Sequence, residues 1–237
     1  MITNQAKKSK LNNYLKVLLW TIIVAVALHI IGQIVLLLAN TDNRVVNDVV
    51  NRFGLDEELS FPTWVNSMLA FVAMIFTGVV GKSYSNKSKR NTWFVIATIC
   101  LLISIDEVVA LHELLLQALH LLAKFGEGHQ GWLANAWLLV MPLVLGGVYL
   151  LIKLIRSNLP KDTFKNLTVA ITVYLFGALV VEYLTSTFDK SSVYYNFGAV
   201  VIEETLEMIG VWLVIKSTIK HIDKHEKELK SKLDNIL

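Results

Sequence analysis

Carboxylates interrupt two apolar runs, and this combination constrains the fold more than any other feature of the sequence. Residues 103–113 read ISIDEVVALHE, and residues 201–210 read VIEETLEMIG. A charged side chain at the centre of a bilayer costs at least about 2.5–3.5 kcal/mol on insertion scales, so such residues are rare and usually functional. We therefore expect the two segments to face each other within a membrane and to share a cation.

The composition supports a membrane protein. Charged residues make up 17% of the 237 residues and hydrophobic residues 54%, whereas soluble domains carry about 25% charged residues. Several apolar runs are longer than the roughly 18 residues that indicate a membrane-spanning helix. The single cysteine, Cys100, excludes a disulfide or a cysteine-based metal site within a monomer. The first apolar run is too long for a cleavable signal peptide.

These features predict an all-α polytopic bundle with six membrane-spanning helices. The expected spans cover residues 15–39, 62–81, 92–116, 132–152, 166–188 and 195–215. The third span is expected to continue as a helix towards Lys124. A short amphipathic helix at the membrane surface is expected between the first two spans, because Val45, Val46, Val49 and Val50 recur at helical spacing. The domain boundaries are a basic N-terminus (1–14), a transmembrane domain (15–216) and a basic helical tail (217–237).

Positive charge predicts the orientation of these spans. Lys and Arg collect in the N-terminus, in the second-to-third and fourth-to-fifth loops, and in the tail. The positive-inside rule then places both termini in the cytoplasm, and we expect a bacterial cytoplasmic (inner) membrane. This topology accounts for the basic residues without nucleic-acid binding. Neighbouring lysines make His221 and His225 part of a predicted solvated face, and Trp93 is predicted to anchor the membrane interface.

The acids are expected to meet at one depth. Each helical residue rises 1.5 Å, so position within a span gives depth. Asp106 lies past the midplane of the third span, Glu182 within about two turns of the outer end of the fifth, and residues 203–207 in the outer half of the sixth. The ionisable groups therefore collect near the extracytoplasmic face. Gly210 continues the acidic face and would let a neighbouring helix approach closely.

This layer predicts a cation site. No Lys or Arg lies at that depth within the spans, and packed carboxylates without a cationic partner cannot all stay ionised. Either a cation neutralises them, or several are protonated and form a structural hydrogen-bonded network. The predicted metal ligands are Asp106, His112, Glu113, Glu182, Glu203, Glu207 and His29, and the predicted general bases are Glu107 and Glu204. Iron, manganese, zinc and magnesium all suit such ligands, although the Glu-x-x-His pattern of di-iron bundles is absent.

Three motifs together resemble a group of uncharacterised bacterial multi-pass membrane proteins of similar length. They are Leu55-Asp56-x-Glu58-x3-Pro62-Thr63-Trp64-x2-Ser67, Ser104-x-Asp106-Glu107-x4-His112-Glu113 and Glu203-Glu204-x2-Glu207-Met208-x-Gly210. The resemblance implies fold and topology but no reaction. It adds Asp56, Glu58, Trp64 and Ser67 as site candidates at the outer mouth. The Glu203-Glu204 pair also resembles the Glu-Glu-x3-Arg motif of intramembrane CAAX-type proteases, but Met208 replaces the arginine and the later histidine motifs are missing.

Three functions fit these observations. The first is a metal-dependent membrane enzyme, a hydrolase or oxidoreductase, that acts on a lipid-like or periplasmic substrate. The second is a proton- or metal-coupled transporter, because Ile105-Asp106-Glu107 and Ile202-Glu203-Glu204 occupy matching positions in two halves of opposite orientation. The third is a non-catalytic metal-binding sensor or assembly partner. The expected partners are membrane lipids and a lipid-linked substrate.

Overall fold

The computed structural model describes residues 2–39, 44–112, 114–115, 118, 137–185, 192 and 195–226. Their regular secondary structure is entirely helical, which confirms the all-α part of the predicted fold class. The long helices are α1 (Ile2–Ala39), α3 (Phe61–Ser83), α4 (Lys87–Val109), α6 (Trp137–Asn158), α7 (Lys161–Leu175) and α9 (Val200–His225). The short elements are α2 (Arg44–Asn51), the π-helical turns η2 (Phe176–Val181) and η3 (Tyr195–Ala199), and α8 (Glu182–Thr185).

Among the described residues, five helical stretches are long and apolar enough to cross a membrane. They are Asn13–Leu38, Phe61–Ser83, Lys87–Val109, Val140–Asn158 and Lys161–Thr185. The sixth expected span, residues 195–215, falls in η3 and α9. At 26 residues, α9 is about 39 Å long, but its apolar part carries four charged residues, Glu203, Glu204, Glu207 and Lys216, more than any of the five stretches has in its apolar window. The structure therefore supports a multi-pass membrane protein and leaves six spans as a prediction.

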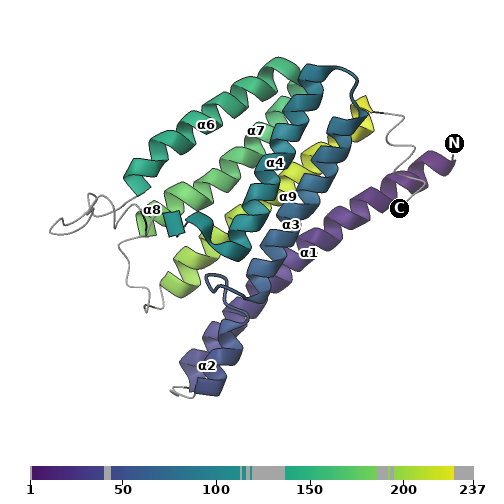
Figure 1. Cartoon of the computed structure of the whole chain (residues 1–237). Coiled ribbons are helices and arrows are strands. Elements are labelled where there is room, and N and C mark those ends of the chain that lie inside the picture. The colour runs from purple at the N-terminus through teal and green to yellow at the C-terminus, as the bar shows by residue number, and fades with distance from the viewer. Residues whose placement is uncertain are drawn as a thin grey trace.

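Helix α9 lies at the centre of the bundle, where it packs against α1, α3, α7 and η2 (Figure 1). Its buried apolar residues follow a spacing of three and four: Met208, Val211, Ile215, Ile219 and Ile222. That spacing places them along one face of a helix. Because other helices surround α9, its polar residues can be enclosed by protein instead of lipid.

Two glycines bring α7, η2 and α9 close together. A Cβ atom built on Gly210 would lie 2.6 Å from the Cβ of Tyr174, and one on Gly177 would lie 2.8 Å from the carbonyl oxygen of Glu203. Real Cβ contacts are essentially never shorter than 3.0 Å, so any larger residue would push the helices apart. The predicted close approach at Gly210 is confirmed.

The third predicted span ends earlier than expected. Ala110 adopts left-handed backbone angles (φ 50°, ψ 45°) directly after α4, so the prediction of a continuous helix towards Lys124 is wrong at this residue. Helix α2 confirms the short helix expected after the first span, and its Val45 and Val49 are exposed as a membrane-surface helix requires. The predicted tail begins inside α9, where Thr218 and Ile222 are buried.

The end of the bundle where α9 finishes contains a buried polar cluster. His221 is 1% exposed and contacts the Tyr84 hydroxyl through Nε2 (2.9 Å) and the Thr163 hydroxyl through Nδ1 (2.7 Å). The buried ring of Trp93 lies 4.9 Å from the imidazole. The predictions of a solvated His221 and an interfacial Trp93 are therefore wrong, because α9 inserts its last turns between α3, α4 and α7. His225 is exposed and contacts Asp162 at 3.2 Å.

Candidate functional site

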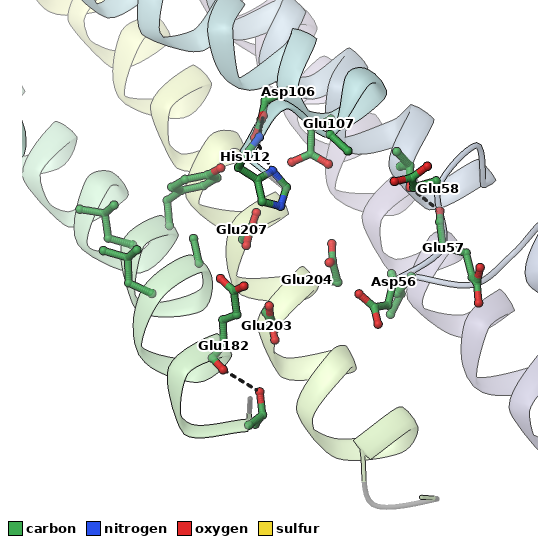
Figure 2. A pocket seen from close by; sticks show the side chains of 18 of the residues that line it. Asp56, Glu57, Glu58, Asp106, Glu107, His112, Glu182, Glu203, Glu204 and Glu207 are labelled. Atoms are coloured by element: carbon green, nitrogen blue, oxygen red, sulfur yellow. Dashed lines mark hydrogen bonds and ion pairs between the residues drawn. The ribbon is translucent and has the colours of Figure 1, made fainter. Parts of the chain in front are cut away.

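A cavity of about 400 Å³ lies at the opposite end of the bundle, between α4, α7–α8, α9 and the loop before α3. Nine carboxylates line it: Asp56, Glu57, Glu58, Asp106, Glu107, Glu182, Glu203, Glu204 and Glu207. Figure 2 shows them around a common space, with Glu57 and Glu58 at its loop side. The described lining includes neither Lys nor Arg. The predicted convergence of acids from separate helices is therefore present in the structure.

The break at the end of α4 brings Asp106 and His112 together. Oδ1 of Asp106 accepts the backbone N–H of His112 at 2.8 Å, and Oδ2 lies 2.8 Å from its Nδ1. The carboxylate accepts, so Nδ1 carries the proton. An imidazole oriented through Nδ1 by a carboxylate is the usual arrangement for metal binding through Nε2. Both residues line the cavity, so this pair is prepared to face a cation.

Glu107 is held by a residue that sequence reasoning did not identify. Asn66 on α3 is 1% exposed, and its Nδ2 donates to Oε1 of Glu107 at 2.9 Å. The Oδ1 of Asn66 is buried and makes no hydrogen bond to a described residue. The available signal was an asparagine within an apolar run, three residues after Thr63. Asn66 therefore fixes the side chain that we predicted as a general base.

Helix α9 supplies Glu203, Glu204 and Glu207 from one turn. Tyr174 on α7 lines the same cavity as these acids. Glu182 reaches the same cavity from α8, directly after the π-helical turn η2. Such turns often occur at functional sites because the extra residue changes which side chains face inward.

The loop before α3 lines one side of the cavity. Its Asp56 accepts a hydrogen bond from the Tyr195 hydroxyl at 3.2 Å. Burial, and then the charge of Asp56, raise the pKa of Glu57 above its usual range. Glu57 was not among the predicted residues, although it stands between two that were. Three acids in a row thus form one wall of the cavity.

His29 lies behind this wall. Its Nδ1 accepts the backbone N–H of Leu55 at 3.1 Å, and its Nε2 donates to the carbonyl oxygen of Asn196 at 3.0 Å. Both ring nitrogens therefore form hydrogen bonds, one to the loop before α3 and one to η3. His29 also does not line the cavity. We leave it out of the proposed ligand set.

Some of the remaining predicted site residues line the cavity and others do not. Trp64 is 57% exposed and stacks on Phe61, while the Ser67 hydroxyl donates to the carbonyl oxygen of Ser104 at 2.8 Å. Neither lines the cavity. Glu113 lies outside the described residues. All the other predicted site residues line the cavity, including Asp56 and Glu58.

The carboxylates surround a space wider than a single ion. Within the parts of the chain that the structure describes, no three His, Cys, Asp or Glu side chains are arranged closely enough to hold a metal ion. Their chemistry nevertheless suits a hard cation, because carboxylate oxygens are the preferred ligands of magnesium and manganese and also serve iron and zinc. The arrangement is that of an acidic binding cavity, not of a closed coordination shell.

A match to a known protein family covers nearly the whole bundle. Residues 17–219 match the model of a family described as Domain of unknown function (DUF8692). No curated protein and no solved structure matches the chain. The matched range begins in α1 and ends in α9, and it includes all nine carboxylates that line the cavity.

Proposed function

The chain belongs to the DUF8692 family, and we propose that it is a metal-dependent membrane enzyme that binds a divalent cation in its acidic cavity and acts on a lipid-like substrate. One observation carries the proposal: nine acidic residues from four separate segments line one cavity whose described lining has no Lys or Arg. Carboxylates packed in a low-dielectric site repel one another unless they are protonated or neutralised. A bound cation provides that neutralisation.

The size of the cavity supports an enzyme. Its volume of about 400 Å³ falls within the roughly 300–1,000 Å³ of small-molecule sites, so a substrate group fits beside an ion. A cation held there would polarise a substrate bond or activate a water molecule. Asp106, Glu203 and Glu207 are the proposed ligands, with His112 oriented by Asp106. Because no three described side chains lie close enough to hold an ion as they stand, these side chains would have to move together around it. Glu107 and Glu204 remain as general bases that accept a proton from the attacking group.

The charge distribution supports a six-span topology with both termini in the cytoplasm. Basic residues collect at the end of the bundle opposite the cavity: Lys82, Lys87, Lys89, Arg90, Lys153, Arg156, Lys161 and Lys165. The positive-inside rule assigns this end to the cytoplasm and the cavity to the extracytoplasmic side. In this topology α9 is the sixth span, its acids enclosed by the surrounding helices.

Transport is the second candidate, because the matching acids of the two halves do line one cavity. Asp106 and Glu107 come from α4, and Glu203 and Glu204 from α9. A transporter also needs a polar route towards the other face. The neighbouring cavity along the bundle is lined almost entirely by aliphatic side chains, which favours an enzyme over a transporter.

Metal titration of the purified protein in lipid nanodiscs tests the proposal. After treatment with a chelator, Mn²⁺, Zn²⁺, Fe²⁺ and Mg²⁺ are titrated into the wild type, Glu203→Gln and Glu207→Gln. Asp48→Asn is the matched control, because Asp48 is an exposed acid on α2 that pairs with Arg44 at 3.8 Å. We expect at least one metal to bind the wild type and the control equally, and both cavity variants to bind it about tenfold more weakly or worse.

Two results would overturn the proposal. One is that no metal binds the wild type, and the other is that all four proteins bind with equal affinity. Metal flux into proteoliposomes then distinguishes the two candidate functions. Flux that requires Glu204 would replace the enzyme with a transporter.

A further inference from the structure

A second cavity, of about 330 Å³, lies beside the acidic one and is not used by the proposed chemistry. Side chains from α3, α4, α6, α7 and α9 line it. They are aliphatic except for Cys100, Tyr174 and a few glycines. Its volume is roughly twice that of an apolar cavity that holds benzene, so it has room for one hydrocarbon chain.

The two cavities adjoin each other. Val144, Tyr174 and Leu175 line both. On α9 the acidic cavity is lined by residues 203–207 and the apolar one by residues 210–214, an offset of about 10 Å along the helix. The apolar cavity therefore extends along the bundle axis from the acidic one, in the direction that the tail of a membrane lipid takes from its head.

We propose that the two cavities together bind a single-chain lipid, with its polar head among the carboxylates and its hydrocarbon chain in the apolar cavity. This inference rests on the proposed function and names the class of its substrate. The head is neutral or positively charged, because a negatively charged head would face nine carboxylates. The chain is single, because a second chain would exceed the volume of the cavity.

Two adjacent glycines on α6 allow a matched test. A Cβ atom on Gly146 or on Gly147 would meet nothing within 4 Å, so both positions accept a larger side chain without a clash at Cβ. Gly147 lines the apolar cavity and Gly146 does not. Gly147→Leu therefore fills the proposed chain site, while Gly146→Leu adds the same side chain elsewhere on the same turn.

The probe is a monoacylglycerol with a diazirine near the end of its chain, cross-linked by light to the protein in nanodiscs and mapped by mass spectrometry. Chelator is present throughout, so the result does not depend on metal binding. We expect the label on peptides that contain Ile99 and Leu151, which line the apolar cavity. Gly147→Leu should reduce this label at least fivefold, and Gly146→Leu should leave it unchanged. Thermal unfolding of each variant shows that it is folded.

Competition tests the head and the chain number. Unlabelled monoacylglycerol and alkyltrimethylammonium should displace the probe, whereas an alkyl sulfate of equal length and a diacylglycerol should displace it at least fivefold less well. Label that spreads over lipid-facing peptides alone, or that falls equally in both glycine variants, would overturn the chain site. Equal competition by the sulfate would overturn the assignment of the head. If labelling follows the prediction and no metal binds, the metal-dependent enzyme fails and the lipid site stands.

Discussion

Asp106 holds His112 through both oxygens of its carboxylate, each at 2.8 Å. In an uninterrupted helix, residues six positions apart lie about 120° apart around the axis and 9 Å apart along it, so this double contact could not form. The left-handed Ala110 turns the chain between them. The contact between Asp106 and His112 therefore depends on the end of α4 at Val109.

Changing Ala110 tests this dependence. The left-handed conformation costs a residue with a Cβ about 1–2 kcal/mol, and glycine avoids that cost while losing about 0.5–1 kcal/mol of backbone entropy. Ala110→Gly should therefore raise the free energy of unfolding by up to about 1.5 kcal/mol. Ala110→Val should lower it, because a β-branched residue tolerates this conformation least. Thermal unfolding in detergent measures both, and equal losses in the two variants would contradict the assigned backbone.

The contributions of Asp106 and His112 to the affinity for a cation should be coupled. Asp106→Asn, His112→Gln and the double variant form a thermodynamic cycle whose readout is the affinity for the metal that the wild type binds. Residues in direct contact show coupling energies of about 0.5–3 kcal/mol. We expect the double variant to lose less affinity than the sum of the single losses. Strict additivity would show that His112 does not act through Asp106.

Asn66 should act as a positioning residue for Glu107. Asn66→Leu removes the donor at 2.9 Å from Oε1 of Glu107 and keeps the volume of the side chain similar. Loss of a group that orients a metal-site residue typically costs about 10–100-fold in metal affinity or activity. Metal titration measures this effect, and Asn66→Gln should restore part of it. Ser67→Ala is the control, because the Ser67 hydroxyl bonds to Ser104 outside the cavity.

The contact between α7 and α9 should depend on Gly210. An alanine there would place its Cβ 2.6 Å from Tyr174, and such overpacking typically costs about 1–3 kcal/mol. Gly210→Ala should lower the midpoint of thermal unfolding, and Gly146→Ala, which meets nothing within 4 Å, should not. An equal change in both variants would show that loss of glycine flexibility, not the contact, sets the effect.

The sequence predicted those parts of the structure that bilayer physics sets. Residues 62–81 were expected to form a helix and lie within α3 (Phe61–Ser83), because an apolar run of this length forms a helix to satisfy its backbone in lipid. The grouping of Glu107, Glu182 and Glu204 was predicted from the expected depth of each residue in spans of predicted direction. Figure 2 shows this layer as one cavity.

The sequence did not predict features that depend on contacts between distant residues. The sequence predicted His29 as a metal ligand because it lies in an apolar run. Its hydrogen-bond partner Asn196 is 167 positions away, so this contact could not be predicted from local sequence. Alanine carries no sequence signal for a left-handed conformation, so the break at Ala110 could not be expected. The burial of His221 depends on Tyr84, which directly follows α3, and on Thr163 in α7.

The buried His221 should make stability depend on pH. It lies beyond the last predicted membrane residue, 215, and burial lowers its pKa from 6.5 to about 4, with a smaller contribution from the neighbouring His225. Asp162 opposes this shift and Lys89 adds to it, and the Tyr84 hydroxyl also faces the ring. The folded state therefore binds this proton more weakly than the unfolded state does.

The sign of the effect follows from that difference. The stabilisation is complete above about pH 6.5, the unfolded value, and it is lost as the pH falls towards 4. Each pKa unit corresponds to 1.36 kcal/mol, so the loss approaches about 3 kcal/mol at most. His221→Gln keeps a side chain able to hydrogen-bond with Tyr84 and does not titrate. Its unfolding midpoint should fall less than that of the wild type between pH 7.5 and pH 5. The midpoint of His225→Gln should fall nearly as much as that of the wild type, because burial is the larger cause of the shift. Parallel curves for the wild type and His221→Gln would show that His221 binds its proton equally well in the folded and unfolded states, and they would contradict this prediction.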